Sequence, residues 1–312
     1  MAERLFLRLD GDEPVGPETG APAEAAREVA VEPKLRAYLA PILAWNERLP
    51  EAQGGAQSVV ERVLPDGAVH IGVNLGDRPI VDGTVAHVAA VVGASTAPAL
   101  VGLRGHIDGL TICVRPGAVA AVLGVPAGAL TDQAVGLDEL WGDDGRELIE
   151  RVAAVRTTAA RARIVQEVLA RRLARGAAVG VDHGVRKAVG HIAGSGGRVT
   201  VRELAATLGV TERRLQQRFH AHVGLAPRAW RRLARLHACL RALRIVRGAS
   251  RTHDERDDRA ARVTSDRREK PRLAWAKLAS DAGFYDQAHL ANEVRALSGL
   301  SPSELLGATS VE

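Results

Sequence analysis

Residues 200–227 read TVRELAATLGVTERRLQQRFHAHVGLAP, and residues 275–302 read WAKLASDAGFYDQAHLANEVRALSGLSP. Both stretches contain a short Leu-Ala segment, then Gly209 or Gly283, where the chain can take a positive φ, and both end in Gly-x-x-Pro. Between these marks, Thr211 and Asp286 are of the residue types that cap the start of a helix. The pattern predicts two pairs of helices, at about 200–223 and 273–296.

A short helix, a tight turn and a capped second helix are typical of a helix-turn-helix, whose second helix enters the major groove of DNA. In the first unit, Arg213, Gln216 and Gln217 occupy the outer face near the start of that helix. Arginine can pair with guanine and glutamine with adenine, so these side chains are predicted to contact bases. Other arginines are better placed for phosphates, which position a protein without reading sequence: Arg214, Arg218, Arg228, Arg231 and Arg232.

The second unit repeats this arrangement. Its apolar set is Leu278, Ala279, Ala282, Phe284 and Leu290. Gln287, His289 and Asn292 are predicted to face the groove and contact bases. A single helix pair is common in any α protein, but two pairs joined by a long helix favour binding to double-stranded DNA.

The charge distribution agrees with this interpretation. Residues 1–175 hold 18 Lys and Arg against 23 Asp and Glu, a net of −5, whereas residues 176–312 hold 24 against 14, a net of +10. A basic half joined to an acidic half is expected of a nucleic-acid-binding domain attached to another domain. No apolar run approaches the ~18 residues of a membrane span, the charged start is unlike a signal peptide, and the two cysteines lie far apart. We therefore expect a cytoplasmic protein without membrane contact or disulfides.

The predicted fold class is α+β: an antiparallel sheet or small barrel with helices, followed by an all-α domain with two helix-turn-helix units. Residues 1–27, rich in Gly, Pro, Glu and Ala, are expected to form a flexible tail. Residues 28–178 are expected to form a sensor or dimerisation domain, and residues 179–312 the DNA-binding domain. Within the first domain, apolar runs flank Pro65-Asp66-Gly67, which predicts a β-hairpin.

The segment 247–272 breaks the helical pattern. It holds nine basic and six acidic residues and almost no large apolar side chain. Such a segment cannot bury a core, so we expect a solvated loop or disorder after a long helix that ends near Val246.

Within the strand region, Trp45, His70, Asn74 and His106 are the side chains predicted to line a ligand cavity. A metal site is not predicted there, because His70, His87 and His106 have no paired spacing and no carboxylate at a fixed offset. Cys113, on an apolar strand, is predicted to be a buried small residue rather than a nucleophile. Hydrolase, phosphate-binding and dinucleotide motifs are absent, so neither an enzyme nor a cofactor is predicted.

The residues over 185–306 resemble the AraC/XylS family of transcription regulators. The resemblance is carried by Leu-Ala-x-x-x-Gly-Val-Thr-x-x-x-Leu-Gln-x-x-Phe over 204–219, by Gly283-Phe284-x-Asp286-Gln287-x-His289-Leu290 and by the two Gly-x-x-Pro ends. The N-terminal half is similar to the sensor region of one subgroup, through residues 62–67, 74–76, 115–118 and 137–142. The sequence departs from the family at Asn292 and Val294, where a basic residue and an aromatic are usual, and in the long charged insertion.

The resemblance implies a regulator, more often an activator than a repressor. It implies that an unknown small-molecule effector or a partner acts on the N-terminal domain, often in a homodimer, and that RNA polymerase is a partner. The alternative is a sensor or interaction protein with a weakened DNA-binding domain, which the two departures favour. Binding to genomic DNA fragments distinguishes the two.

Overall fold

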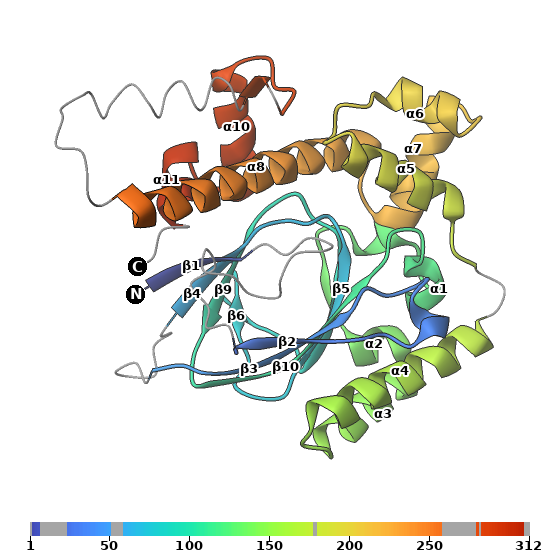
Figure 1. Ribbon diagram of the computed structural model, residues 1–312. Coiled ribbons are helices and arrows are strands. Elements are labelled where there is room, and N and C mark those ends of the chain that lie inside the picture. Colours follow the sequence, from blue (N-terminus) through green and yellow to red (C-terminus); the bar gives the residue numbers. More distant parts are fainter. Residues whose placement is uncertain are drawn as a thin grey trace.

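The computed structural model describes residues 2–6, 24–50, 59–176, 180–257, 279–280 and 282–308. Over these residues the chain is a mixed α/β protein, with two largely antiparallel sheets followed by helices (Figure 1). The coarse fold class is therefore confirmed.

The larger sheet has six strands, all paired antiparallel, in the order β11-β8-β5-β10-β3-β2. In that order they are Ala134–Gly136, Ala89–Val92, Val69–Asn74, His106–Val114, Ile42–Arg48 and Ala26–Val29. In β5, Val69, Ile71 and Val73 are buried, and the residues between them are half-buried. This alternation indicates that one face of the sheet packs on a core.

The smaller sheet has the order β1-β4-β9-β6-β7. Its strands are Ala2–Phe6, Val59–Val63, Ala99–Leu103, Ile80–Val81 and Thr84–Val85. β1 and β4 are parallel, and the other pairs are antiparallel. The flexible tail predicted for 1–27 is therefore wrong for residues 2–6 and for the start of β2, because Leu5 is buried in the core and Phe6 packs on Trp45. Residues 7–23 lie outside the described residues.

The hairpin predicted around Pro65-Asp66-Gly67 is also wrong. β4 pairs with β1 and β9, whereas β5 pairs with β10 and β8, so the turn carries the chain from one sheet to the other. Gly67 has the expected positive φ, 78°. The turn contacts the C-terminal half, because the His237 Nε2 atom lies 2.9 Å from the Pro65 carbonyl oxygen.

The two sheets face one another, and helices cover the outer face of the larger one. Between the sheets, the rings of Phe6 and Trp45 lie 5.4 Å apart. On the outer face, Arg161 donates to Asp108 of β10 at 2.6 Å. The short helical elements of this half are η2 Pro33–Leu35, α1 Val119–Leu123, η4 Ala127–Leu130 and α2 Leu137–Trp141, and the longer ones are α3 Asp143–Ala153 and α4 Thr158–Arg175.

The C-terminal half is helical. Its helices are α5 His183–Gly194, α6 Val201–Thr207, α7 Glu212–Val223, α8 Pro227–Asp257, α10 Gln287–Ser298 and α11 Pro302–Ala308. The loop expected from residue 247 is wrong as far as Asp257, because α8 continues to that residue. Adding a residue to an existing helix gains a hydrogen bond without new nucleation, so an apolar face is not required. Residues 258–272 lie outside the described residues.

The two halves are in close contact. Figure 1 shows α8 lying across the top of the sheets. Buried side chains of the sheets, such as Ile71, and of α7 and α8, such as Phe219 and Leu233, belong to one continuous apolar cluster. Between α4 and α5, residues 177–179 lie outside the described residues, and the Asp182 amide donates to the Gly117 carbonyl at 2.8 Å.

Candidate functional site

The first helix pair, α6 and α7, is defined by two caps and one turn. Thr200 and Glu203 form a reciprocal capping box at the start of α6. Gly209 takes φ 64° in the turn, and the Thr211 side chain then accepts from the Arg214 amide at 3.2 Å, which starts α7. The residues that hold the two helices together are buried (Leu204, Ala205, Leu215, Phe219 and Val223), and Leu208 and Val210 beside them are half-buried.

The outer face of α7 presents the three predicted base-contacting residues. Arg213, Gln216 and Gln217 are all exposed. Gln216 and Gln217 follow Arg213 by three and four residues, so the three side chains lie on one side of the helix. The opposite side is buried through Leu215 and Phe219. The helix is therefore anchored by one face while three long polar side chains project into solvent from the other.

The five arginines predicted to contact phosphates fall into two groups. Arg214 and Arg228 are exposed. Arg218 forms an ion pair with Asp182, Arg231 donates to the Gly197 carbonyl at 3.3 Å, and Arg232 donates to Glu293 of α10 at 2.7 Å. The last contact joins α8 to α10, the helix that carries the second predicted set.

The second helix pair is described only in part, because residues 273–278, including Leu278, lie outside the described residues. Asp286 caps α10 by accepting from the His289 amide at 2.7 Å. Gln287 and Asn292 are exposed, whereas the His289 ring is half-buried and packs edge-on against Phe284. Val294, which departs from the family pattern, is a buried core residue.

The four predicted ligand-binding residues divide between the two faces of the larger sheet. Strand register places Trp45 and Asn74 on either side of Gly109, and His70 opposite Cys113, all on the face toward the smaller sheet. Trp45 donates to Thr111 at 3.2 Å, and Asn74 donates to the His87 carbonyl at 2.8 Å. His106 falls on the opposite face by the same alternation.

Charged groups also meet between the sheets. Arg4 donates to both oxygens of Glu47 at 2.9 and 2.7 Å, and Glu61 lies opposite Arg4 in the β1–β4 register. Burial raises the pKa of the Glu61 carboxyl from 4.5 to about 7; Arg4 lowers it in part, and Glu47 raises it further. The interior of the sheets thus holds a carboxyl that titrates near neutral pH.

This pKa gives a prediction for stability. Because Glu61 binds its proton more tightly in the folded state, the free energy of unfolding should fall as pH rises from 4.5 through about 7. Glu61→Gln should remove that fall and exceed the wild type at alkaline pH by about 1–3 kcal/mol. Urea unfolding at acidic and at alkaline pH measures both. Glu150→Gln, at an exposed position of α3, should behave as the wild type, and an unchanged pH slope in Glu61→Gln would contradict the assignment.

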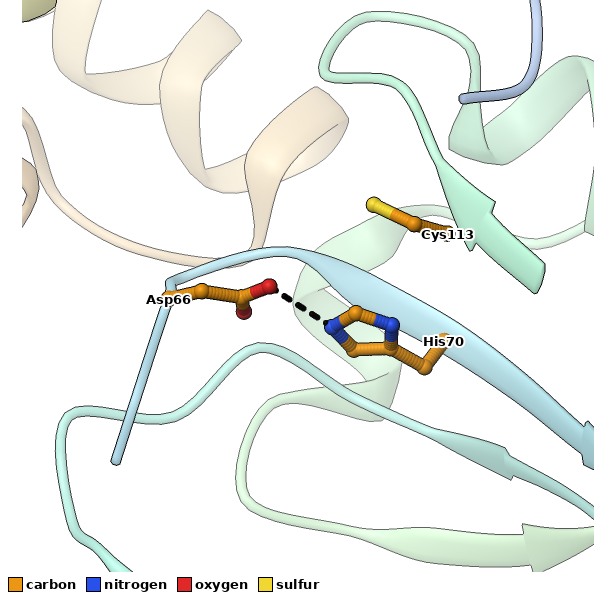
Figure 2. A group of neighbouring side chains, drawn as sticks. All are labelled: Asp66, His70 and Cys113. Atoms are coloured by element: carbon orange, nitrogen blue, oxygen red, sulfur yellow. Dashed lines mark hydrogen bonds and ion pairs between the residues drawn. The ribbon is translucent and has the colours of Figure 1, made fainter. Parts of the chain in front are cut away.

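A further cluster was not predicted from the sequence. The side-chain donor atoms of Asp66, His70 and Cys113 lie within 4.8 Å of one another, and these three residues are the one such group of three among the residues that the structure describes. Figure 2 shows Asp66 and His70 pointing toward one another, with the Cys113 thiol directed to the same side. The Asp66 and His70 side chains are 22% and 28% exposed. Burial opposes ionisation of Asp66, but His70, the Ala68 amide and His237 outweigh it and lower the pKa of this carboxyl.

The sequence analysis missed this cluster because its members come from three places. Asp66 belongs to the turn between the sheets, His70 to β5 and Cys113 to β10. No His-x-His spacing joins these residues. The spacing of four between Asp66 and His70 was the available indication.

An open groove lies away from this cluster. It has a volume of about 450 Å³ and is lined by α1, the residues after it, and Asp144, Arg172 and Arg175. Both arginines pair with Asp144, so one of their two positive charges is neutralised. None of the predicted ligand-binding residues lines this groove.

Residues 27–136 match the model of a domain of unknown function, DUF6597. No curated protein matches the chain in sequence. None of the helices that the structure describes has the length and apolar character needed to cross a membrane.

Among solved structures, the chain is similar to an apo ToxT variant from Vibrio cholerae, with 11% identity and a TM-score of 0.42 over 86% of this chain and 98% of that one. It is also similar to ToxT from Vibrio cholerae O395, with 8% identity and a TM-score of 0.42 over 87% of this chain and 99% of that one. A third similar structure is unsaturated fatty acid bound wild-type ToxT from Vibrio cholerae, with 8% identity and a TM-score of 0.41 over 86% of this chain and 95% of that one.

Proposed function

We propose that the chain is a sequence-specific DNA-binding regulator of transcription of the AraC/XylS type. The observation that carries the proposal is α7, a capped helix with one face in the core and Arg213, Gln216 and Gln217 exposed on the other. A helix built in this way can place its side chains against base edges while the protein fixes its axis. α10 is the second reading helix, and the two enter successive major grooves about 34 Å apart on one face of the duplex.

The N-terminal half, in this proposal, is the sensor of a cytoplasmic regulator that acts with RNA polymerase as an activator. Its effector is a small molecule or a partner that acts on the inner face of the larger sheet, near Trp45, His70 and Asn74. The continuous apolar core between the halves supports this arrangement, because a change among the sheets can reach α7 and α8 through packed side chains. A homodimer is the expected assembly.

A second candidate function is an interaction protein with weakened DNA binding. It is favoured by Arg218, Arg231 and Arg232, each of which donates to groups within the chain. Fewer arginines are then free to neutralise phosphates, and the sequence-independent part of DNA affinity falls with each one lost.

The test begins with selection of genomic fragments by the full chain. On a selected site, Arg213→Ala should cost about 1–3 kcal/mol of binding free energy and relax the preference at one base position. Arg228→Ala should weaken all sites alike and reduce the slope of affinity against salt by about one phosphate contact. Arg146→Ala, exposed on α3 in the other half, is the matched control and should bind as the wild type.

Two results would count against the proposal. Failure of the wild type to retain any fragment above the background of random DNA would favour the interaction protein. An equal loss for Arg213→Ala on every site variant would remove the base-contacting role of that residue.

A further inference from the structure

Strand register and one turn bring three different metal-binding side chains to one point. His70 of β5 lies directly opposite Cys113 of β10. Side chains of such a cross-strand pair leave the sheet on the same face, with their Cβ atoms about 4.5–5.5 Å apart. Asp66 precedes β5 by one turn, and its Oδ2 atom lies 2.9 Å from His70 Nε2. The backbone therefore brings the three side chains to one place, and their donor atoms lie within 4.8 Å of one another.

We propose that Asp66, His70 and Cys113 form a binding site for a divalent cation of the zinc type. The three supply one carboxylate oxygen, one imidazole nitrogen and one thiolate sulfur. Zinc accepts all three donor types, whereas magnesium and calcium favour oxygen alone. Three protein ligands leave the fourth tetrahedral position for water or another small ligand.

The distances suit this coordination after a small adjustment. Bonds of about 2.0–2.3 Å from zinc place tetrahedral donor atoms roughly 3.3–3.8 Å apart. The three donor atoms already lie within 4.8 Å, so the sulfur has about 1 Å to move, and the Asp66–His70 pair opens slightly from 2.9 Å. Asp66 Oδ1 accepts from the Ala68 amide at 2.9 Å, which holds the carboxylate in place while Oδ2 exchanges His70 for the metal.

The site lies next to the contact between the two halves of the chain. Asp66 stands between Pro65, whose carbonyl oxygen faces His237 of α8 at 2.9 Å, and Gly67, which packs against Trp230. A cation at Asp66 therefore binds within one residue of the points where the sheets touch α8. This position is distinct from the groove beside α1 and from the Arg4, Glu47 and Glu61 group.

Cobalt titration of the full chain tests the proposal, because cobalt substitutes for zinc and reports its ligands by absorption. With a phosphine reductant present, Co²⁺ should give visible bands of a tetrahedral site and a near-ultraviolet thiolate-to-cobalt band, and equimolar Zn²⁺ should remove both. Cys113→Ser should abolish the thiolate band. Cys239→Ser is the matched control: it changes the other cysteine, buried on α8, and should keep the band.

His70→Gln and Asp66→Asn should each weaken cobalt binding at least tenfold. Circular dichroism and thermal melting of every variant separate a lost ligand from a lost fold, and Cys113→Ser keeps nearly the same side-chain volume. The proposal is overturned if the wild type gives no tetrahedral cobalt spectrum, if the thiolate band survives in Cys113→Ser, or if it disappears in Cys239→Ser alone. None of these results depends on DNA binding.

Discussion

Replacing Gly67 with alanine is expected to lower the free energy of unfolding by about 2–5 kcal/mol. Two costs combine at this position. Gly67 has φ 78°, a left-handed conformation that costs an L-residue about 1–2 kcal/mol. A methyl group there would also lie 2.8 Å from Trp230 Cε3 and 2.9 Å from Leu233 Cδ1. Trp230 and Leu233 are 9% and 1% exposed, so neither can move aside freely.

Gly83→Ala provides the matched control. Gly83 has φ 84°, but it is exposed in the turn between β6 and β7, and an added methyl would meet no described atom within 4 Å. Its cost should be the conformational term alone, about 1–2 kcal/mol. Chemical denaturation of both variants measures the difference, which belongs to the contact between the turn and α8.

A double variant locates the clash. Trp230→Leu removes the ring that the new methyl group meets, so Gly67→Ala combined with Trp230→Leu should lose less than the sum of the single losses. Equal losses for Gly67→Ala and Gly83→Ala would show that the turn does not press against α8. The turn would then not contribute to the proposed coupling between the two halves.

The sequence predicted the local elements of the C-terminal half well, because their determinants are local. Thr211 caps α7 and Gly209 takes a positive φ whatever the rest of the chain does, and Leu215 and Phe219 mark the buried face by their spacing. The exposure of Arg213, Gln216 and Gln217 follows directly, since they occupy the remaining face.

The sheets were predicted only in outline, because pairing depends on residues far apart in sequence. Pro65-Asp66-Gly67 has the composition of a hairpin turn, but nothing local shows that β4 finds β1 and β9 while β5 finds β10 and β8. The same limit hid the site at Asp66, His70 and Cys113. His70 and Cys113 become neighbours through strand register alone, and a one-residue shift of β10 would turn the thiol to the other face.

The conformation of α8 shows a different limit. Charge and the lack of apolar side chains after Arg247 predicted a loop, although those features determine whether a segment can bury a core and not whether a helix can continue. α8 reaches Asp257. Composition was therefore a guide to burial and a poor guide to secondary structure.

Asp182→Ala is expected to cost about 3–5 kcal/mol, because it removes one partner of a half-buried ion pair and leaves the other charge behind. Asp182 joins three parts of the chain. Its carboxylate caps α5 by accepting from the Val185 amide at 2.9 Å, accepts from Arg218 Nε of α7 at 3.0 Å, and lies 3.3 Å from His222 Nε2. Its side chain is 11% exposed and that of Arg218 is 27% exposed.

The backbone strengthens this connection. The Asp182 amide donates to the Gly117 carbonyl, and the Gly117 amide donates to the His222 carbonyl at 3.2 Å. Asp182 therefore ties α7, the proposed reading helix, to the first half of the chain at Gly117, two residues before α1. This tie and the turn at Gly67 are two of the contacts that join the halves of the chain.

The stability that the Asp182 carboxylate contributes depends on pH. Burial opposes ionisation of Asp182, but Arg218, the Val185 amide and His222 outweigh it and lower the pKa of the carboxyl. A lowered pKa contributes stability above the unfolded value of about 3.9, and this contribution is lost as pH falls through the folded value. The gap between the wild type and Asp182→Ala should therefore be full near neutral pH and should shrink in acid.

Two variants complete the measurement. Asp182→Asn keeps an oxygen for the Val185 amide but loses the charge, so its loss should be smaller than that of Asp182→Ala by roughly the value of a helix cap, about 1 kcal/mol. Asp143→Ala breaks an ion pair with Arg146 at the exposed start of α3, where the carboxylate is 96% exposed, and should cost no more than about 0.5 kcal/mol. If Asp182→Ala cost as little as Asp143→Ala, the ion pair would have no part in fixing α7 to the first half of the chain.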